Sequence, residues 1–269
     1  MKILSGIAIL LVFISCNNAD SEDNKEGSII ETPAINYVVK KTHPHDTTSF
    51  TEGLLFHKGQ LYESTGSPDD LPGTRSLFGV LSLETGLISK KVELDRKKYF
   101  GEGIVFFNDK VYQLTYKNKI GFIYDATTFR KLSEFTIPSQ EGWGMTTDGH
   151  RLIMSDGTSQ LTYLDPETLQ VRKTITVSDA RGSVPYLNEL EFIKGFIYAN
   201  VYTTNELIKI DPGNGQVVAK LDLSSLANEV KSLYPGSLKM NGIAYDSLNN
   251  KTYITGKMWP KIYEISFAY

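Results

Sequence analysis

The segment Gly101–Lys117, GEGIVFFNDKVYQLTYK, contains the unit from which the fold can be predicted. A carboxylate between two glycines precedes an apolar run, a turn with Asn and Asp, and a second alternating run. Such runs, bounded by turn residues, indicate a β-hairpin. Segments with the same order of residues begin at Thr51, Gly142, Asn188 and Asn241. The chain therefore contains five copies of one hairpin.

Each copy is followed by a third apolar run, such as FGVLSLETG, and the first four also by a fourth, such as LISKKVEL. The fifth copy ends with the chain, whereas a spare strand, INYVVKK, lies at Ile35–Lys41 before the first copy. Pairing between this spare strand and the last strand of the fifth copy would complete a ring. Repeats of about 40 to 55 residues with four strands are typical of β-propeller blades. The sequence predicts an all-β, five-bladed propeller with four-stranded blades, closed by the N-terminal strand, and one helix near Ser224–Tyr234.

Composition is consistent with one sizeable domain and excludes an obvious nucleic-acid surface. The chain has 269 residues, 41% of them hydrophobic, and a net charge of -3. Charges of both signs are interspersed, so no basic face is expected to bind nucleic acid. A closed propeller covers its own sheet edges, and we expect a monomer.

The first 34 residues are predicted to lie outside the propeller. MKILSGIAILLVFISC combines a lysine, a short apolar run and a single cysteine, Cys16, which is the only cysteine of the chain. Residues 1–16 are interpreted as a signal peptide, and the cysteine resembles the lipidated residue of a bacterial lipobox, although Phe13 is unusual there. Residues 17–34 are polar at first and are predicted to be a disordered tether. We expect an exported, envelope-attached protein; a plain cleaved signal peptide is the alternative.

The first residues of the five hairpins are predicted to surround a central pocket. The triplets are Thr51-Glu52-Gly53, Gly101-Glu102-Gly103, Gly142-Trp143-Gly144, Asn188-Glu189-Leu190 and Asn241-Gly242-Ile243. In a propeller this position begins the innermost strand, where the blades converge and where small-molecule sites are favoured. Glycine allows the backbones to approach closely. The residues between the glycines would face the pocket, or would only satisfy backbone groups of the inner strands, as is plausible for Glu189 and Glu191.

Other site chemistries lack their motifs. His43 and His45 have no accompanying HExxH or CxxC element, so catalytic zinc is unsupported, and both are expected to help the N-terminal strand turn into the first blade. No nucleophile elbow, Walker loop or dinucleotide fingerprint occurs. Inner-strand carbonyls and carboxylates could ligate a structural calcium ion, but no calcium loop is recognisable. Carboxylate, amide, aromatic and lysine side chains remain, which suit proton transfer in an enclosed pocket.

Residues 35–269 resemble the plant- and bacterial-type glutaminyl cyclases, or glutaminyl-peptide cyclotransferases. The segments that carry the resemblance, in the family's order, are HDTTSFTEGL, FGEGIVFFNDKVYQLTYK, EGWGMTTDG, LNELEFIKGFIYANV and NGIAYD with YITGKMWPKIYEI. The resemblance implies a five-bladed propeller that converts an N-terminal glutamine into pyroglutamate with release of ammonia. It implies no cofactor for catalysis, and peptides or free glutamine as substrate.

The resemblance also implies roles for individual residues. Glu102 would be the catalytic carboxylate that moves a proton from the amine to the leaving nitrogen. Asn188 would bind the substrate's amide or backbone, and Lys257 would stabilise negative charge on the carboxamide oxygen. The remaining implied pocket residues are Phe50, Glu52, Phe100, Tyr116, Trp143 and Tyr202.

Three of these positions depart from the family pattern. Tyr116 and Tyr202 stand where tryptophan is common, and Glu52 stands where glutamine is frequent. A second carboxylate near Glu102 would raise one of the two pKa values, or would bind the substrate's ammonium group. The alternatives to a cyclase are a non-catalytic propeller that binds ligands at the envelope, and a glycosidase or lyase that uses Glu52 and Glu102 as paired acids.

Overall fold

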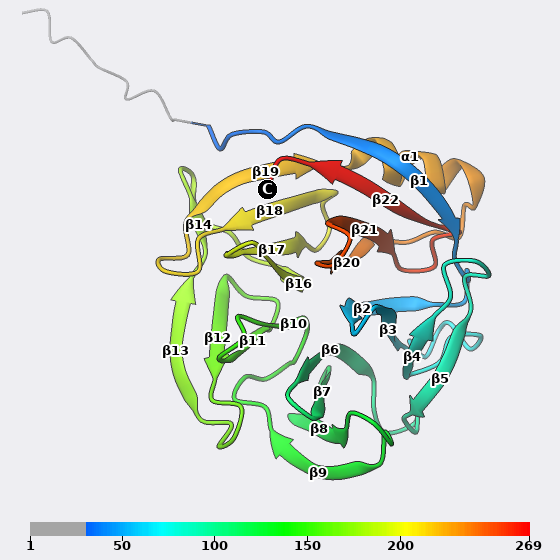
Figure 1. The fold of residues 1–269 in the computed structure, drawn as a ribbon, viewed down its shortest axis with the longest axis vertical. Coiled ribbons are helices and arrows are strands. Elements are labelled where there is room, and N and C mark those ends of the chain that lie inside the picture. Colours follow the sequence, from blue (N-terminus) through cyan, green and yellow to red (C-terminus); the bar gives the residue numbers. More distant parts are fainter. Residues whose placement is uncertain (1–30) are drawn as a thin grey trace, which may run out of the picture.

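The protein is a five-bladed β-propeller, seen in a computed structural model that describes residues 31–269 (Figure 1). The predicted signal peptide, lipidation at Cys16 and most of the tether lie outside the described residues. Pro33 and Ala34, which were assigned to the tether, pair with Lys220 of β19. Within residues 31–269, no helix has the length and apolar character needed to cross a membrane.

The blades follow one another along the chain, each with its first strand nearest the axis. Blade 1 consists of β2 (Phe50–His57), β3 (Gln60–Gly66), β4 (Leu77–Leu81) and β5 (Ile88–Glu93). Blade 2 consists of β6 (Gly101–Phe107), β7 (Lys110–Thr115), β8 (Ile120–Asp125) and β9 (Lys131–Thr136). Blade 3 consists of β10 (Met145–Thr147), β11 (Leu152–Ser155), β12 (Gln160–Leu164) and β13 (Val171–Thr176).

A short hairpin, β14 (Ser178–Asp179) and β15 (Gly182–Ser183), connects blade 3 to blade 4. Blade 4 consists of β16 (Leu187–Ile193), β17 (Phe196–Val201), β18 (Glu206–Ile210) and β19 (Val217–Asp222). The helix α1 (Ser224–Leu233) follows where it was predicted. Blade 5 consists of β20 (Met240–Asp246), β21 (Lys251–Gly256), β22 (Lys261–Phe267) and the N-terminal β1 (Tyr37–Pro44), which pairs antiparallel with β22.

Ring closure by β1 confirms the prediction, and buried polar contacts secure it. The imidazole of His45, just after β1, lies 3.1 Å from both carboxylate oxygens of Glu63 in β3 and 2.8 Å from the Trp259 carbonyl in blade 5. Thr51 donates a hydrogen bond of 2.7 Å to the same carboxylate. The N-terminal segment is therefore bound to both blades that it joins.

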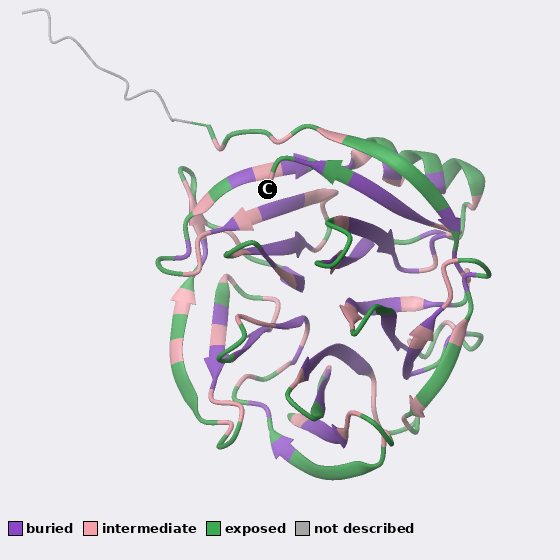
Figure 2. Ribbon diagram, viewed as in Figure 1, coloured by how far each residue is buried: buried purple, intermediate pink, exposed green. Residues whose placement is uncertain are grey.

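Five apolar cores lie between neighbouring blades, one at each interface. Between blades 1 and 2, for example, Leu55 and Tyr62 pack with Ile104 and Phe106. In blades 1 and 2 the two inner strands are mostly buried, whereas the outermost strands, β5 and β9, are mostly exposed (Figure 2). Each blade thus acts as a half-buried sheet that needs both neighbours.

The sequence triplets coincide with irregularities in the inner strands. In four blades the register between the first and second strand shifts at the triplet, between Thr51 and Gly53, Gly101 and Ile104, Leu187 and Leu190, and Met240 and Ile243. Such bulges leave residues outside the ladder and change the direction of their side chains. This explains how polar triplet residues can point away from the blade cores.

Backbone groups at the triplets bond to the next blade. Ser64 donates to the Glu102 carbonyl at 2.6 Å, and Gly103 N–H donates to the Trp143 carbonyl at 2.8 Å. Ser155 donates to the Asn188 carbonyl at 2.7 Å. Equivalent bonds, Gly242 N–H to Asn200 at 3.0 Å and Asn241 to the Thr51 carbonyl at 3.0 Å, complete the circle. The bulges are thus tied to one another around the axis.

We predict that Gly144 is essential for this convergence. A Cβ at Gly144 would lie 2.1 Å from the Asn188 carbonyl oxygen, whereas a Cβ at Gly73 would meet nothing within 4 Å. Gly144→Ala should lower the free energy of unfolding in urea by about 2 kcal/mol or more, because the obstacle is backbone. Gly73→Ala, the matched control, should change it by about 0.5 kcal/mol at most. Equal stability of the two variants would contradict the close packing described here.

Candidate active site

One cavity of about 490 Å³ opens at the end of the propeller where the triplets lie. Its size is within the usual range of small-molecule sites. All the pocket residues expected from the sequence line it: Phe50, Glu52, Phe100, Glu102, Tyr116, Trp143, Asn188, Tyr202 and Lys257. They come from all five blades, so the site exists only when the ring is closed.

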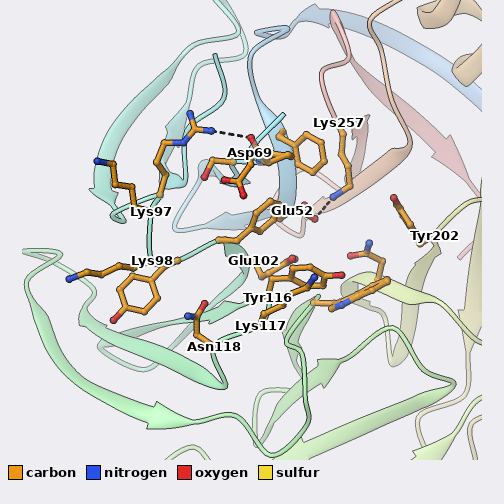
Figure 3. Close-up of a pocket in the computed structure, with 18 residues that line it drawn as sticks. Glu52, Asp69, Lys97, Lys98, Glu102, Tyr116, Lys117, Asn118, Tyr202 and Lys257 are labelled. Atoms are coloured by element: carbon orange, nitrogen blue, oxygen red, sulfur yellow. Dashed lines mark hydrogen bonds and ion pairs between the residues drawn. The ribbon is translucent and has the colours of Figure 1, made fainter. Parts of the chain in front are cut away.

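The floor of the cavity contains two carboxyl groups and one ammonium group. Glu52, Glu102 and Lys257 are almost completely buried. Lys257 Nζ forms an ion pair with Glu52 Oε2, and Glu102 lies directly beside them (Figure 3). Asn241 also donates to Glu52 Oε2 at 3.2 Å. Glu52 is thus held from two sides, whereas no salt bridge to Glu102 occurs among the described residues.

Burial and mutual repulsion separate the protonation states of the two carboxyls. The pKa of Glu102 is raised well above its ordinary value, first by burial and next by the neighbouring Glu52 charge, with Lys257 opposing the shift. The pKa of Glu52 is raised by burial, but the Lys257 charge and its hydrogen bond oppose this. The ion pair favours the charged form of Glu52, so the proton of the pair resides on Glu102.

Local structure fixes the position of Lys257. The strand β21 ends at Gly256, and Met258 follows with a positive φ of 60° while its N–H bonds to the Ser49 carbonyl at 2.7 Å. The fully buried Trp259 packs against Gly256 and donates to the Leu238 carbonyl at 3.0 Å. The tight turn directs the lysine inward, and the tryptophan anchors it.

Aromatic rings form an arc around the charged floor. Successive ring centroids lie 5.9 Å apart for Phe50 and Phe100, 5.7 Å for Phe100 and Tyr116, 6.4 Å for Tyr116 and Trp143, and 5.6 Å for Trp143 and Tyr202. Lys257 Nζ lies 4.4 Å from the Phe50 centroid and 6.0 Å from that of Tyr202, which closes the arc. Tyr116 and Tyr202 therefore supply ring surface at the two positions where the resemblance led us to expect tryptophan.

Asn188 provides an unused hydrogen-bond acceptor. Its side chain is buried, and its Oδ1 has no partner among the described residues. A buried polar atom without a partner is costly in a folded protein, and a ligand bound in the cavity can supply the missing bond. The amide can accept a bond from an amine or from a peptide N–H.

Two glutamates near the axis do not line the cavity and have structural roles. Glu189 accepts the N–H groups of Ile243 at 2.8 Å and Leu54 at 3.3 Å, which joins three blades. Glu191 accepts the N–H of Tyr245 at 2.8 Å. Both satisfy inner-strand backbone groups, which confirms the structural interpretation of these residues.

Sequence reasoning missed several residues that shape the site. Glu141 accepts a hydrogen bond of 3.0 Å from the Trp143 indole and orients that ring. Asn241 was recognised only as part of a triplet, although its side chain holds Glu52. The other missed residues line the cavity from three loops: Ser67, Pro68, Asp69, Arg96, Lys97, Lys98, Tyr99, Lys117 and Asn118. Loop residues carry no periodic signal that would place them beside the mouth.

The described residues provide no recognisable metal centre. Among residues 31–269, no group of three or more His, Cys, Asp or Glu side chains is arranged to hold a metal ion. The cavity instead combines a proton-carrying carboxyl, a buried ammonium, an amide and aromatic walls. This set suits acid–base chemistry on a small polar substrate.

Comparison with known proteins identifies the family to which this propeller belongs. The family model of glutamine cyclotransferases matches residues 8–267. A glutaminyl-peptide cyclotransferase of Arabidopsis thaliana is 36% identical over 269 residues, which are 98% of this chain and 81% of that protein. The crystal structure of Myxococcus xanthus glutaminyl cyclase matches with a TM-score of 0.77 at 29% identity, covering 88% of this chain and 98% of that one. The chain belongs to the glutamine cyclotransferase family.

The buried ion pair predicts a pH-dependent loss of stability when Lys257 is replaced. Lys257→Met leaves Glu52 without its cation, so the folded-state pKa of Glu52 rises further and its proton is retained. Because the unfolded chain releases this proton at lower pH, the loss should grow as pH rises. We expect about 3 kcal/mol at pH 8 and clearly less at pH 5, measured by urea unfolding.

The double variant Glu52→Gln/Lys257→Met is the matched control. It lacks both members of the ion pair and should recover most of the stability at pH 8, because Glu52 no longer leaves a buried carboxyl that has lost its cation. An equal loss at both pH values, or no recovery in the double variant, would contradict the pairing.

Proposed function

We propose that this protein is a glutaminyl-peptide cyclotransferase that converts an N-terminal glutamine into pyroglutamate and releases ammonia. The observation that carries the proposal is the Glu52–Lys257 ion pair beside Glu102 inside the aromatic arc. The Arabidopsis relative and the Myxococcus structure, which are named for this activity, support the same conclusion.

Positioning contributes much of the acceleration in such a reaction. Nucleophile and electrophile belong to one residue, so the enzyme must hold the rotamer in which the α-amine faces the γ-carbonyl carbon. The aromatic arc confines the aliphatic part of the side chain. Asn188 Oδ1, which lacks a partner in the free protein, accepts a hydrogen from the substrate's amine or backbone.

Glu102 moves the proton. The α-nitrogen forms a bond to the γ-carbon, and the proton that it loses passes to the Glu102 carboxylate. Glu102 then gives a proton to the amide nitrogen as its bond to the γ-carbon breaks, and ammonia leaves. A raised pKa suits both proton transfers, because the same carboxyl group must accept a proton and then donate one near neutral pH. The α-nitrogen attacks as a neutral amine. A substrate that enters as an ammonium therefore first loses one proton to solvent, and before that loss its charge beside the pair favours ionisation of Glu102.

Lys257 stabilises the negative charge that develops on the carboxamide oxygen. Its ammonium group is buried, pre-oriented over Phe50 and close to Glu102. A fixed cation in a cavity of low polarity acts more strongly than one in water. In the free protein the Lys257 ammonium is paired with the Glu52 carboxylate. Glu52 therefore holds Lys257 in place and also competes with the substrate's carboxamide oxygen for the ammonium group.

The first prediction of this proposal concerns the proton carrier. A protein that lacks residues 1–25 should release ammonia from a Gln-initiated dipeptide, with or without EDTA, since no cofactor takes part. Glu102→Gln should lower kcat by about a hundredfold or more while the fold is retained, on the usual scale of acid–base catalysis. Absence of ammonia release by well-folded parent protein would point to the alternative, a propeller that only binds its ligand.

A second prediction concerns Glu52. Its negative charge raises the pKa of Glu102, so Glu52→Gln should lower that pKa. Because Glu102 must be ionised to accept the proton, the acid limb of the kcat/KM profile should move to lower pH. Glu141→Gln, which changes a carboxylate at the aromatic wall, is the control and should move the limb much less. An unshifted limb in Glu52→Gln would show that the two carboxyls are not coupled.

The cellular setting is part of the proposal and rests on the sequence alone. The apolar run before Cys16 predicts export and attachment to the envelope by a lipid. The substrate would then be exported peptides or free glutamine, and the protein would act as a monomer.

A further inference from the structure

The cavity extends from the reaction site toward loops of blades 1 and 2. Half of its lining residues are those of the floor and the aromatic arc together with Asn188. The other half come from three loops of blades 1 and 2: β3–β4 with Ser67, Pro68 and Asp69, β5–β6 with Arg96 to Tyr99, and β7–β8 with Lys117 and Asn118. When the N-terminal glutamine occupies the floor, this extension is the part of the cavity left for the residues that follow it.

Positive charge dominates the extension. Its charged side chains are Asp69, Arg96, Lys97, Lys98 and Lys117. Among the described residues, none of the three lysines has a carboxylate within salt-bridge distance. This local excess of cations contrasts with the net charge of -3 of the whole chain. We call Lys97, Lys98 and Lys117 the lysine rim.

Hydrogen bonds hold the backbone beneath Lys97 and Lys98 in place. The Arg96 guanidinium donates to the carbonyls of Pro72 at 2.8 Å, Thr74 at 3.1 Å and Pro68 at 3.0 Å, which joins two of the loops. Asp95 accepts the Lys97 N–H through its side chain at 3.0 Å, and its carbonyl accepts the N–H groups of Lys98 and Tyr99 at 2.9 Å. The backbone that carries two of the rim lysines is therefore held in one turn.

The ammonium groups lie at two depths. Lys117 Nζ lies over the Tyr116 ring, 4.7 Å from its centroid, next to the reaction site. Lys97 and Lys98 project outward from the cavity in Figure 3. A chain that leaves the floor thus meets Lys117 first and then the field of the outer two. An exposed ammonium attracts a carboxylate over a screening length of about 10 Å at moderate salt.

We propose that the lysine rim selects substrates that carry a carboxylate shortly after the N-terminal glutamine. This inference rests on the proposed cyclotransferase function and names its substrate class. The carboxylate can be an acidic side chain or the C-terminal carboxylate of a very short peptide, since both present the same group to an ammonium.

The test compares peptides that differ only in charge. Gln-Ala-Glu-Ala-NH2 and Gln-Ala-Lys-Ala-NH2 vary the side chain, and Gln-Ala and Gln-Ala-NH2 vary the terminal carboxylate. At low salt we expect kcat/KM to be about tenfold higher for the acidic member of at least one pair, with the difference shrinking in about 0.5 M salt. Whichever pair shows the preference identifies the source of the carboxylate.

Charge reversal links the preference to the rim. Lys97→Glu/Lys98→Glu/Lys117→Glu should invert the preference, and Lys117→Glu alone, which keeps most of the rim, should reduce it. Lys110→Glu is the control, because Lys110 is exposed and begins β7 at the strand end opposite to Lys117. It should leave the preference unchanged.

Binding provides a readout that does not depend on turnover. Calorimetric titration of the same peptides into Glu102→Gln should give the same order of affinities. Equal kcat/KM and equal affinity within both pairs, or a preference that survives charge reversal, would overturn the inference. Absence of turnover of every peptide by the folded wild type would instead overturn the proposed function, while the affinities would still test the rim.

Discussion

The close approach of five backbones at the propeller axis is the constraint on which the rest of the structure depends. Inner strands can converge only if their first residues have little or no side chain toward the neighbour, as at Gly103 and Gly144. Four of the triplets leave the regular ladder as bulges, and their backbone groups bond to a neighbouring blade. This arrangement frees the residues between the glycines to face the cavity. The packing requirement and the functional site thus share the same short segments.

The site concentrates buried charge that an isolated blade would not tolerate. Glu52 comes from blade 1, Glu102 from blade 2 and Lys257 from blade 5, so the ion pair forms only across the closed ring. Burial of each charge is unfavourable and is offset by its partner and by hydrogen bonds such as that from Asn241. A carboxyl left without a cation then retains its proton. The unequal protonation of Glu52 and Glu102 follows from this asymmetry.

Much of this organisation could be predicted from the sequence because it is periodic. Hairpins that recur with turn residues between them fixed the blade count, and the missing fourth strand of the last copy indicated ring closure. The triplets located the mouth and contain four of the residues that line it, Glu52, Glu102, Trp143 and Asn188. The family resemblance added Phe50, Phe100, Tyr116, Tyr202 and Lys257. The partners within the mouth were not predictable: pairing of Lys257 with Glu52 depends on a left-handed turn at Met258, and the lysine rim depends on three loops that meet only in the folded ring. Such contacts form only in the folded protein, and the local pattern of residues along the sequence does not predict them.

Titration of the Glu102 carboxyl tests the account most directly. Carbon-13 labelling of glutamate side chains, with the signal assigned from Glu102→Gln, would follow its protonation by NMR in the parent protein and in Glu52→Gln. The account predicts a Glu102 pKa well above the ordinary range of glutamate in the parent, and a lower pKa once the Glu52 charge is gone. An ordinary pKa in both proteins would contradict the raised proton affinity of Glu102 on which the proposed mechanism rests.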